Sequence, residues 1–303
     1  MHFRKTNKVI TFHEVKNPAW FETVVKYLKN KYNIITAKQL YEFYYDHKSF
    51  KNACLITVDD GHSRSYDVIY PILKKYNVPA IFFVSPEIAK RENATNFWFQ
   101  EIRDYDKEKL ANIIKTHSNK QDNPEKDHKV LIESETIDNI WKIISKYQKL
   151  YSVIRKEPQN MTIEQIRQID KEGLVEIGAH TLTHPFLANE TDIRAKEEIH
   201  SSIKQLEEIL GHTVLTFAYP NGRPIFDFGE REKQFLKETS VKLAFSSYPH
   251  NFSLSDDAFA IPRYGLTYGT LLFVKMKLFL GNYYVVIKKI IRTSINIFQK
   301  YDA

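Results

Sequence analysis

Two pairs of residues in this sequence have the types and spacing that a divalent metal ion prefers. Asp59 and Asp60 are adjacent acids followed by Gly61, while His180 and His184 are four positions apart in the segment HTLTH. Imidazole is the commonest ligand of transition metals, and two imidazoles with a carboxylate leave a coordination position for water on zinc. Adjacent carboxylates repel each other unless a cation neutralises them. The two pairs together therefore favour a metal site.

Each pair also has an ordinary explanation, which stays open at this point. Asp-Gly is common in turns, so residues 59–61 could form a polar loop without a ligand. A histidine pair with this spacing on an exposed helix often has no function. In this chain the pair lies between a predicted strand and Pro185, so an exposed helix describes it poorly.

Short apolar runs alternate with helical patterns, which predicts repeated β/α units. Helices are predicted from the Asn17-Pro18 pair onward, over 66–76 and 161–171, and in the apolar stripe that ends at Gly211. The predicted strands are 8–13, 53–58, 80–84, 175–179, 214–218 and 242–246.

The polar segments DDG, HTLTH and YPNG each follow one of these predicted strands directly. In β/α barrels the carboxyl ends of the strands share one face, where the active site is built. We therefore expect the three segments to converge, although they lie far apart in the chain.

The segments TVDDG (57–61), HTLTH (180–184) and FAYPNG (217–222) resemble, in this order, the first three motifs of the polysaccharide deacetylase, or NodB-homology, family of carbohydrate esterases. The resemblance is almost continuous over 161–187 and extends over about 8–265. It implies an α/β fold, a distorted (β/α)7 barrel, and a divalent metal, with Zn²⁺ as the expected ion. We expect a catalytic barrel over 1–267 with a helical insertion at about 97–160, followed by a basic, amphipathic helical segment over 268–303.

The resemblance also implies roles for the two residue pairs. Asp60, His180 and His184 would bind the metal, and Asp59 would be the general base that activates the water held there. Zinc can lower the pKa of its water from 15.7 to about 7, which makes such a water reactive at neutral pH.

The third motif departs from the family pattern. Its usual first residue is an arginine that pairs with the catalytic aspartate, and that position is Ala218 here. Arg263, in the segment AIPRY, could supply the guanidinium or could form an ordinary surface ion pair. Backbone N–H groups at Tyr219 and Asn221 would hold the oxyanion, so the replacement of the usual tyrosine by Asn221 is tolerable.

Three further residues are candidates on residue type and position. The family's late Leu-x-His motif is absent, and His250 is the only histidine after His212, so His250 is the candidate general acid. His13, at the end of the first strand, could line the substrate pocket or be a core histidine. Trp98, in FWF, could stack on a sugar, or it could pack in the core, as large aromatic residues often do.

The positive charge of the chain is concentrated near its end. The formal net charge is +7, and residues 258–303 contain seven Lys and Arg and one acid, so the rest is nearly neutral. A general nucleic-acid binder spreads basic residues over its recognition surface, so we expect no nucleic acid partner. Residues 271–298 combine apolar stretches with five basic residues and no acid. This segment could lie on an anionic membrane surface or close the barrel.

The composition is that of a globular protein, with 43% hydrophobic and 14% aromatic residues. Cys54 is the single cysteine, so nothing requires an oxidising compartment. The chain starts without a signal-peptide pattern and has no apolar run of about 18 residues. We expect a cytoplasmic protein with peripheral contact to the inner membrane face through its basic segment.

The predicted function is a hydrolase that removes an N-acyl group, in the first instance N-acetyl, from an amino sugar. The substrate partner would be a glycan or a sugar precursor, including a lipid-linked one. A noncatalytic carbohydrate-binding or scaffold protein with the same fold is the alternative, supported by the altered third motif and the missing acid motif. The intact set of Asp59, Asp60, His180 and His184 argues against it. A formyl group or an O-ester as the group removed also stays open.

Overall fold

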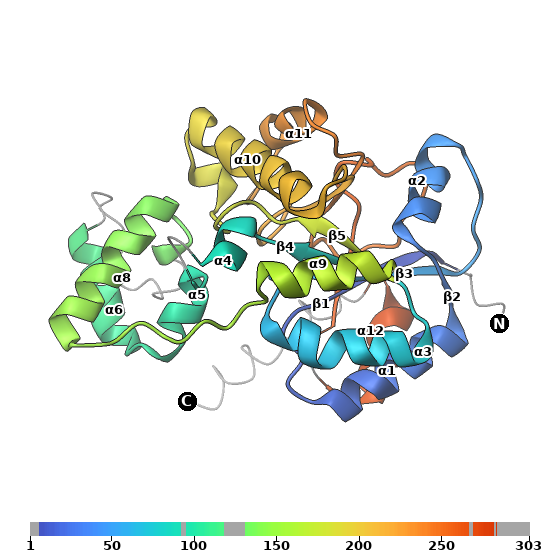
Figure 1. The fold of residues 1–303 in the computed structure, drawn as a ribbon, viewed down its shortest axis with the longest axis horizontal. Helices are drawn as coiled ribbons and strands as arrows, with labels where there is room; N and C mark the ends of the chain where they lie inside the picture. Colours follow the sequence, from blue (N-terminus) through green and yellow to red (C-terminus); the bar gives the residue numbers. More distant parts are fainter. Residues whose placement is uncertain (1–5, 92–94, 118–130, 267–268, 282, 284–303) are drawn as a thin grey trace, which may run out of the picture.

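One curled sheet of parallel strands forms the centre of the molecule (Figure 1). The computed structural model describes residues 6–91, 95–117, 131–266, 269–281 and 283. The strands run in the order β7-β6-β5-β4-β3-β1-β8, and β2 pairs with β3 outside this path. The strands are β1 (Lys8–Phe12), β2 (Asn33–Ile34), β3 (Ala53–Val58), β4 (Ala80–Val84), β5 (Val175–Ala179), β6 (Thr216–Ala218), β7 (Leu243–Phe245) and β8 (Tyr264–Gly265).

Helices cover the outer face of the sheet and form a separate lobe beside it (Figure 1). Around the sheet lie α1 (Pro18–Lys31), α2 (Ala37–Tyr45), α3 (Tyr70–Tyr76), α4 (Pro86–Lys90), α9 (Ile163–Glu172), α10 (Asp192–Leu210), α11 (Glu230–Lys237) and α12 (Leu271–Leu280). The lobe contains α5 (Trp98–Glu101), α6 (Lys107–His117) and α8 (Ile137–Tyr151).

The central strands are apolar on both faces because both faces are covered, as is usual in parallel sheets. Every residue of β1, β3 and β4 is buried. Alternate side chains join two different clusters, since neighbouring residues of a strand point to opposite faces. Phe82 packs with the helices in the larger cluster, whereas Phe83 packs with Phe245 on the inner side of the curl.

One segment, residues 258–265, connects the two edges of the sheet. Ile261 exchanges backbone hydrogen bonds with Ala244 and Ser246 beside β7. Immediately afterwards β8 pairs with β1. This segment closes the curl, and the predicted distorted (β/α)7 barrel is confirmed.

Several predicted elements differ in extent from the observed ones. The strand predicted over 214–218 begins only at Thr216, because the Val214 N–H bonds the Glu207 side chain at 3.1 Å and not a neighbouring strand. The helix predicted over 66–76 starts as a π-helical turn at Ser65–Ile69 before it continues as α3.

The helical insertion has a core of its own. Isoleucines of α8 pack against α6, and Phe186 of the barrel side joins this cluster. Thr136 caps α8 by accepting the N–H of Asn139. Residues 118–130 of this region lie outside the described residues.

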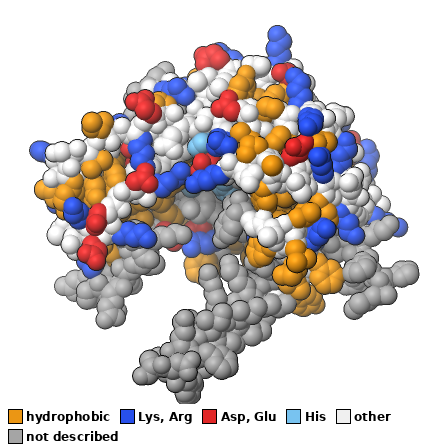
Figure 2. All heavy atoms as spheres, turned by 90° about the horizontal axis from the view of Figure 1, so that it is seen from below, with side chains coloured by type: hydrophobic (Ala, Val, Ile, Leu, Met, Phe, Trp, Pro, Cys, Tyr) orange, Lys and Arg blue, Asp and Glu red, His pale blue; other side chains and the backbone are white. Residues whose placement is uncertain are grey.

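The basic segment begins with α12, which packs on the barrel. Val274 and Leu278 join the main core beside α1, whereas Leu272 and Phe279 are 67% and 66% exposed. Seen from below, the molecule carries patches of hydrophobic side chains separated by Lys and Arg (Figure 2). Residues 284–303 lie outside the described part. No helix in the described ranges combines the length and apolar character needed to cross a membrane.

Candidate active site

The acid pair and the histidine pair meet at the carboxyl ends of β3 and β5. Asp60 follows β3, and its Oδ1 lies 3.4 Å from His180 Nε2 and 3.7 Å from His184 Nε2. One ligand atom from each of the three side chains lies within 4.8 Å of the others. The structure thus brings together the three residues predicted to bind a metal.

The strand β6 fixes the orientation of His180. The Nδ1 atom of this ring lies 2.7 Å from the carbonyl oxygen of Ala218. Since a carbonyl only accepts, Nδ1 carries a hydrogen, and Nε2 is directed toward Asp60. Metal-binding histidines are commonly held in this way. Burial disfavours charge on His180, but the nearby carboxylates outweigh it and raise its pKa.

His184 lies in a drier environment. Its ring is buried, with Phe97 and Phe99 at centroid distances of 5.5 and 5.0 Å. Burial, with the neighbouring His180, lowers the pKa of His184 to about 4, so its imidazole is neutral at pH 7. Burial also opposes the charge of Asp60, but His180 holds the pKa of Asp60 below its usual value.

Asp60 Oδ1 is buried, faces Nε2 of both histidines, and has no hydrogen-bond partner among the described residues. Buried polar atoms normally have partners, so each such exception requires an explanation. An ionised carboxylate and two imidazole nitrogens facing one point fit a divalent cation. The residues present therefore suit a metal ion.

Unusual backbone conformations are concentrated in the same loops. Asp60, Thr181, His184 and Asn221 all have φ between 58° and 69°, a region that non-glycine residues rarely occupy. Such strain persists only where the surrounding contacts enforce it, and it is frequent at functional sites. Gly61 has φ 60° as well, and a Cβ there would meet Val84 Cγ1 at 3.0 Å.

Arg263 binds the other aspartate. Its guanidinium donates to both carboxylate oxygens of Asp59, at 2.7 and 2.8 Å. It also donates to the Ser246 carbonyl at 2.9 Å, and its carbon lies 5.6 and 5.9 Å from the ring centres of Phe83 and Phe245. Arg263 is only 1% exposed, which excludes the ordinary surface ion pair. Burial opposes ionisation of Asp59, but the charge of Arg263 lowers its pKa below the usual value, so Asp59 is an anion at neutral pH.

Two other predicted site residues, His13 and Tyr219, directly follow β1 and β6. His13 Nε2 is 3.8 Å from Asp59 Oδ2 and its side chain is 41% exposed, so His13 lines the site and does not belong to the core. The Tyr219 N–H already donates to the Phe245 carbonyl at 3.2 Å. Because this N–H is already in use, we keep the prediction of an oxyanion-binding N–H for Asn221 alone.

Trp98 and His250 have contacts that the sequence did not indicate. Trp98 is buried against Phe186, and its indole N–H donates to the His184 carbonyl at 3.0 Å. It therefore helps to hold the histidine loop, residues 180–184, which carries His180 and His184. The stacking of Trp98 on a sugar stays a prediction. His250 lies after β7 with its ring stacked on Tyr248. Its role as the acid also stays a prediction.

Sequence reasoning missed Glu198, which holds the histidine loop. This fully buried acid of α10 accepts the N–H groups of Leu182 and Thr183, both at 3.0 Å, and the Thr183 hydroxyl at 2.8 Å. Arg194 pairs with it at 3.0 Å. The signal was present: Glu198 occupies a core-facing position of α10, between Ala195 and Ser202. A charged residue at such a position requires partners.

Comparisons with known proteins agree with this geometry. A family model described as polysaccharide deacetylase matches residues 47–241. A Bacillus subtilis (strain 168) protein, provisionally named polysaccharide deacetylase YxkH, is 34% identical over 85 residues. That match covers 27% of this chain and 30% of the relative, so the shared stretch spans less than a third of the relative's length.

Solved structures share the fold at low sequence identity. The Streptococcus pyogenes deacetylase PplD in complex with acetate is 17% identical with a TM-score of 0.58, over 86% of this chain and 92% of that one. IcaB from Ammonifex degensii is 18% identical with a TM-score of 0.60, over 91% and 97%. The BpsB deacetylase domain from Bordetella bronchiseptica is 15% identical with a TM-score of 0.57, over 87% and 97%.

Proposed function

Because the chain belongs to the polysaccharide deacetylase family, we propose that it is a metal-dependent hydrolase that removes an N-acyl group from an amino sugar. Acetyl is the proposed acyl group, and a glycan or glycan precursor is the proposed substrate. The observation that carries the proposal is the cluster of Asp60, His180 and His184 next to the arginine-bound Asp59. A protein that only binds carbohydrate has no need for this full set.

The proposed ion is Zn²⁺, held by Asp60, His180 and His184. When bound, such an ion lowers the pKa of a water and polarises the acyl carbonyl. The neutral imidazole of His184 can bind a cation without first losing a proton, and Nε2 of His180 is directed toward the same carboxylate, Asp60.

The remaining chemistry is assigned to the protein's own groups. Asp59 would accept a proton from the attacking water, whose oxygen adds to the acyl carbon. The bidentate contact with Arg263 keeps Asp59 ionised and fixes its orientation, which are the two properties a general base requires. The N–H of Asn221 would donate to the oxyanion. The C–N bond then breaks, the amine takes a proton, for which His250 is the proposed donor, and the acyl group leaves as a carboxylate.

We further propose a lipid-linked substrate at the inner face of the membrane. The support is α12, which exposes Leu272, Met276 and Phe279 and carries Lys275 and Lys277 without an acid. Exposed apolar side chains next to lysines suit an anionic membrane surface, where each Lys contributes about 1 kcal/mol of attraction.

The test of hydrolysis combines metal content with acetate release from N-acetylglucosamine oligomers. We expect about one equivalent of zinc per chain and acetate release in the wild type. Asp59→Asn should keep the zinc and lose the activity, since it removes the base and not a ligand. A wild type that binds no metal after zinc is added back would overturn the hydrolytic mechanism.

Sedimentation with phosphatidylglycerol vesicles tests the membrane contact. Phe279→Asp should reduce vesicle binding several-fold, whereas Ile225→Asp, at a 90% exposed residue of another region, should not. Equal binding of both variants and the wild type would overturn the membrane contact and leave the hydrolase proposal intact.

A further inference from the structure

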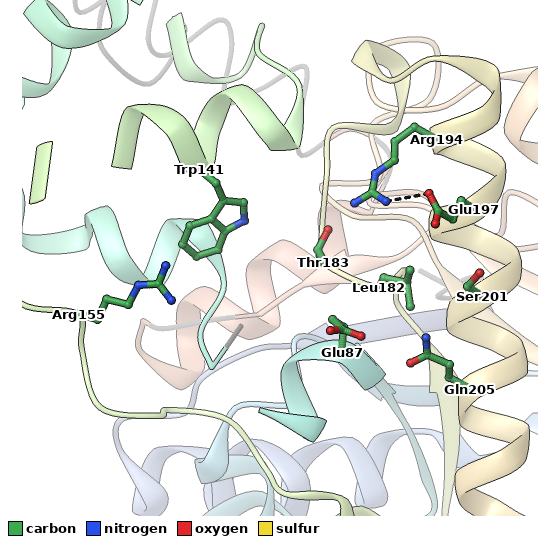
Figure 3. A pocket seen from close by; sticks show the side chains of 9 residues that line it. All are labelled: Glu87, Trp141, Arg155, Leu182, Thr183, Arg194, Glu197, Ser201 and Gln205. Carbon is green, nitrogen blue, oxygen red and sulfur yellow. Dashed lines mark hydrogen bonds and ion pairs between the residues drawn. The ribbon is translucent and has the colours of Figure 1, made fainter. Parts of the chain in front are cut away.

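A cavity of about 490 Å³ lies between the helical insertion and α10 (Figure 3). Leu182 and Thr183 of the histidine loop form one of its walls. The volume lies within the range of ligand pockets in proteins. The other lining residues are Glu87, Trp141, Arg155, Arg194, Glu197, Ser201 and Gln205.

Two buried polar atoms of the cavity lining have no hydrogen-bond partner among the described residues. They are Nε of Arg194, which can only donate, and Oε1 of Gln205, which can only accept. The two residues lie about three turns apart on the same face of α10, with Ser201 between them. The cavity therefore offers an extended ligand both an unused donor and an unused acceptor.

The opposite wall is aromatic. Trp141 of α8 projects toward the cavity across from Arg194 and Gln205 (Figure 3). The guanidinium of Arg155 lies 5.8 Å from the centre of the Trp141 ring. The two arginines of the lining are matched by two glutamates, so the cavity has no net formal charge and does not favour a phosphate or another polyanion.

From these features we propose that the cavity is a second carbohydrate site, which binds neutral pyranose units of a glycan chain. A pyranose has C–H groups on its faces, which pack on an aromatic ring, and hydroxyl groups around its rim, which donate and accept. Trp141 would supply the platform, and Arg194 and Gln205 would bind the hydroxyls. The class of ligand rests on the proposed function, but the site is separate from Asp60, His180 and His184.

Arg194 connects this site to the histidine loop. Its guanidinium pairs with Glu198, and Glu198 accepts the N–H groups of Leu182 and Thr183. A glycan bound to Arg194 would therefore contact the ion-pair partner of Glu198, the residue that holds the histidine loop.

The test measures binding of the N-acetylglucosamine tetramer by calorimetry, with the full chain and a chelator that prevents hydrolysis. Saturable binding is expected for the wild type and for His184→Ala. Trp141→Ala and Gln205→Leu should weaken it at least tenfold. Gln234→Leu, which changes an exposed glutamine of α11, is the matched control and should bind like the wild type.

The inference is overturned if the wild type shows no saturable binding, or if Trp141→Ala and Gln205→Leu both bind within twofold of it. It is also overturned if His184→Ala abolishes binding, because the tetramer would then occupy the metal site only. If Trp141→Ala fails to fold, as judged by its melting curve, Gln205→Leu alone decides. Saturable binding in this test, together with no acetate release in the separate zinc-loaded assay, would support this cavity and count against the proposed function, so the two can fail separately.

Discussion

The two aspartates at the end of β3 are adjacent in the chain, yet their surroundings differ. Both oxygens of Asp59 accept hydrogen bonds from Arg263, whose guanidinium is itself held by the Ser246 carbonyl. Asp60 faces two imidazoles at 3.4 and 3.7 Å, and its Oδ1 has no hydrogen-bond donor among the described residues. On the arginine side, Asp59 has all its partners within the protein, whereas on the histidine side Asp60 Oδ1 faces only the imidazole nitrogens of His180 and His184. We expect the arginine side to support stability, and we propose that the histidine side binds a cation.

The largest expected effect comes from removing a metal ligand. Asp60→Ala and His184→Ala should lower the rate of acetate release by about 10⁴-fold or more, which corresponds to about 5 kcal/mol of activation free energy. The metal-free Asp60→Ala form should unfold at the wild-type urea concentration or above, because the change removes an unsatisfied buried carboxylate. Metal analysis and urea unfolding with a chelator check both points. A large loss of stability in the metal-free Asp60→Ala variant would refute the proposed difference between the surroundings of Asp59 and Asp60.

Removing Arg263 should lower stability, in contrast to the loss of Asp60. Arg263→Met leaves the Asp59 carboxylate buried and unpaired, so we expect a loss of about 3–5 kcal/mol in the free energy of unfolding, with or without metal. Arg103→Met, which breaks the exposed pair with Glu14, is the matched control and should cost at most about 1 kcal/mol. The double variant of Arg263→Met with Asp59→Asn should recover part of the loss. Equal urea midpoints for the two single arginine variants would contradict this.

Glu198 supports the histidine side indirectly, so its effect should be smaller and specific to the metal. Glu198→Gln disturbs the acceptors of the Leu182 and Thr183 N–H groups, and we expect metal affinity to fall about 10- to 100-fold. The Co²⁺ absorption spectrum of the site should also change, which a loss of stability alone would not cause. Glu208→Gln, at an exposed acid of the same helix, should leave both readouts unchanged.

Lys8 shows a third way to accommodate a buried charge and should give the smallest effect. It is 2% exposed, and burial lowers its pKa from 10.5 to about 8. Between pH 8 and 10.5 the unfolded chain then binds more protons than the folded one, so wild-type stability should gain from Lys8 as pH rises. Urea unfolding at pH 7.5 and pH 10 should show this gain in the wild type and a smaller one in Lys8→Met. An equal pH dependence of the two proteins would disprove the role of Lys8.

Much of the fold was predictable because continuous apolar runs and helix caps are local signals. The strands β3, β4 and β5 have the predicted bounds, and Gly211 ends its helix as expected. The closing segment, residues 258–265, was harder to predict. Its strand β8 is only two residues long and pairs with β1, whereas its Ile261 pairs with Phe245 at the other edge of the sheet. Its role depends on tertiary pairing that no local pattern encodes.

The candidate site could likewise be predicted only in part from the sequence. The residue types and order of the motifs placed Asp60, His180 and His184 together, because the ends of parallel strands must meet. Hydrogen bonds to backbone groups could not be predicted, such as the Trp98 indole on the His184 carbonyl. The hydrogen bond from the Tyr219 N–H to the Phe245 carbonyl could not be predicted either, because a backbone partner depends on register and not on side-chain type.

The closing segment carries Arg263, which is 204 positions from its partner Asp59. During synthesis, Asp59 therefore emerges from the ribosome long before the guanidinium that will bind it, and it stays hydrated until residues 258–265 insert between the sheet edges. Contacts so distant in sequence form late, because the intervening chain must first lose its freedom. The base of the proposed reaction would then acquire its final ionisation and orientation only as the barrel closes, so a nascent or partly folded chain would not hydrolyse its substrate.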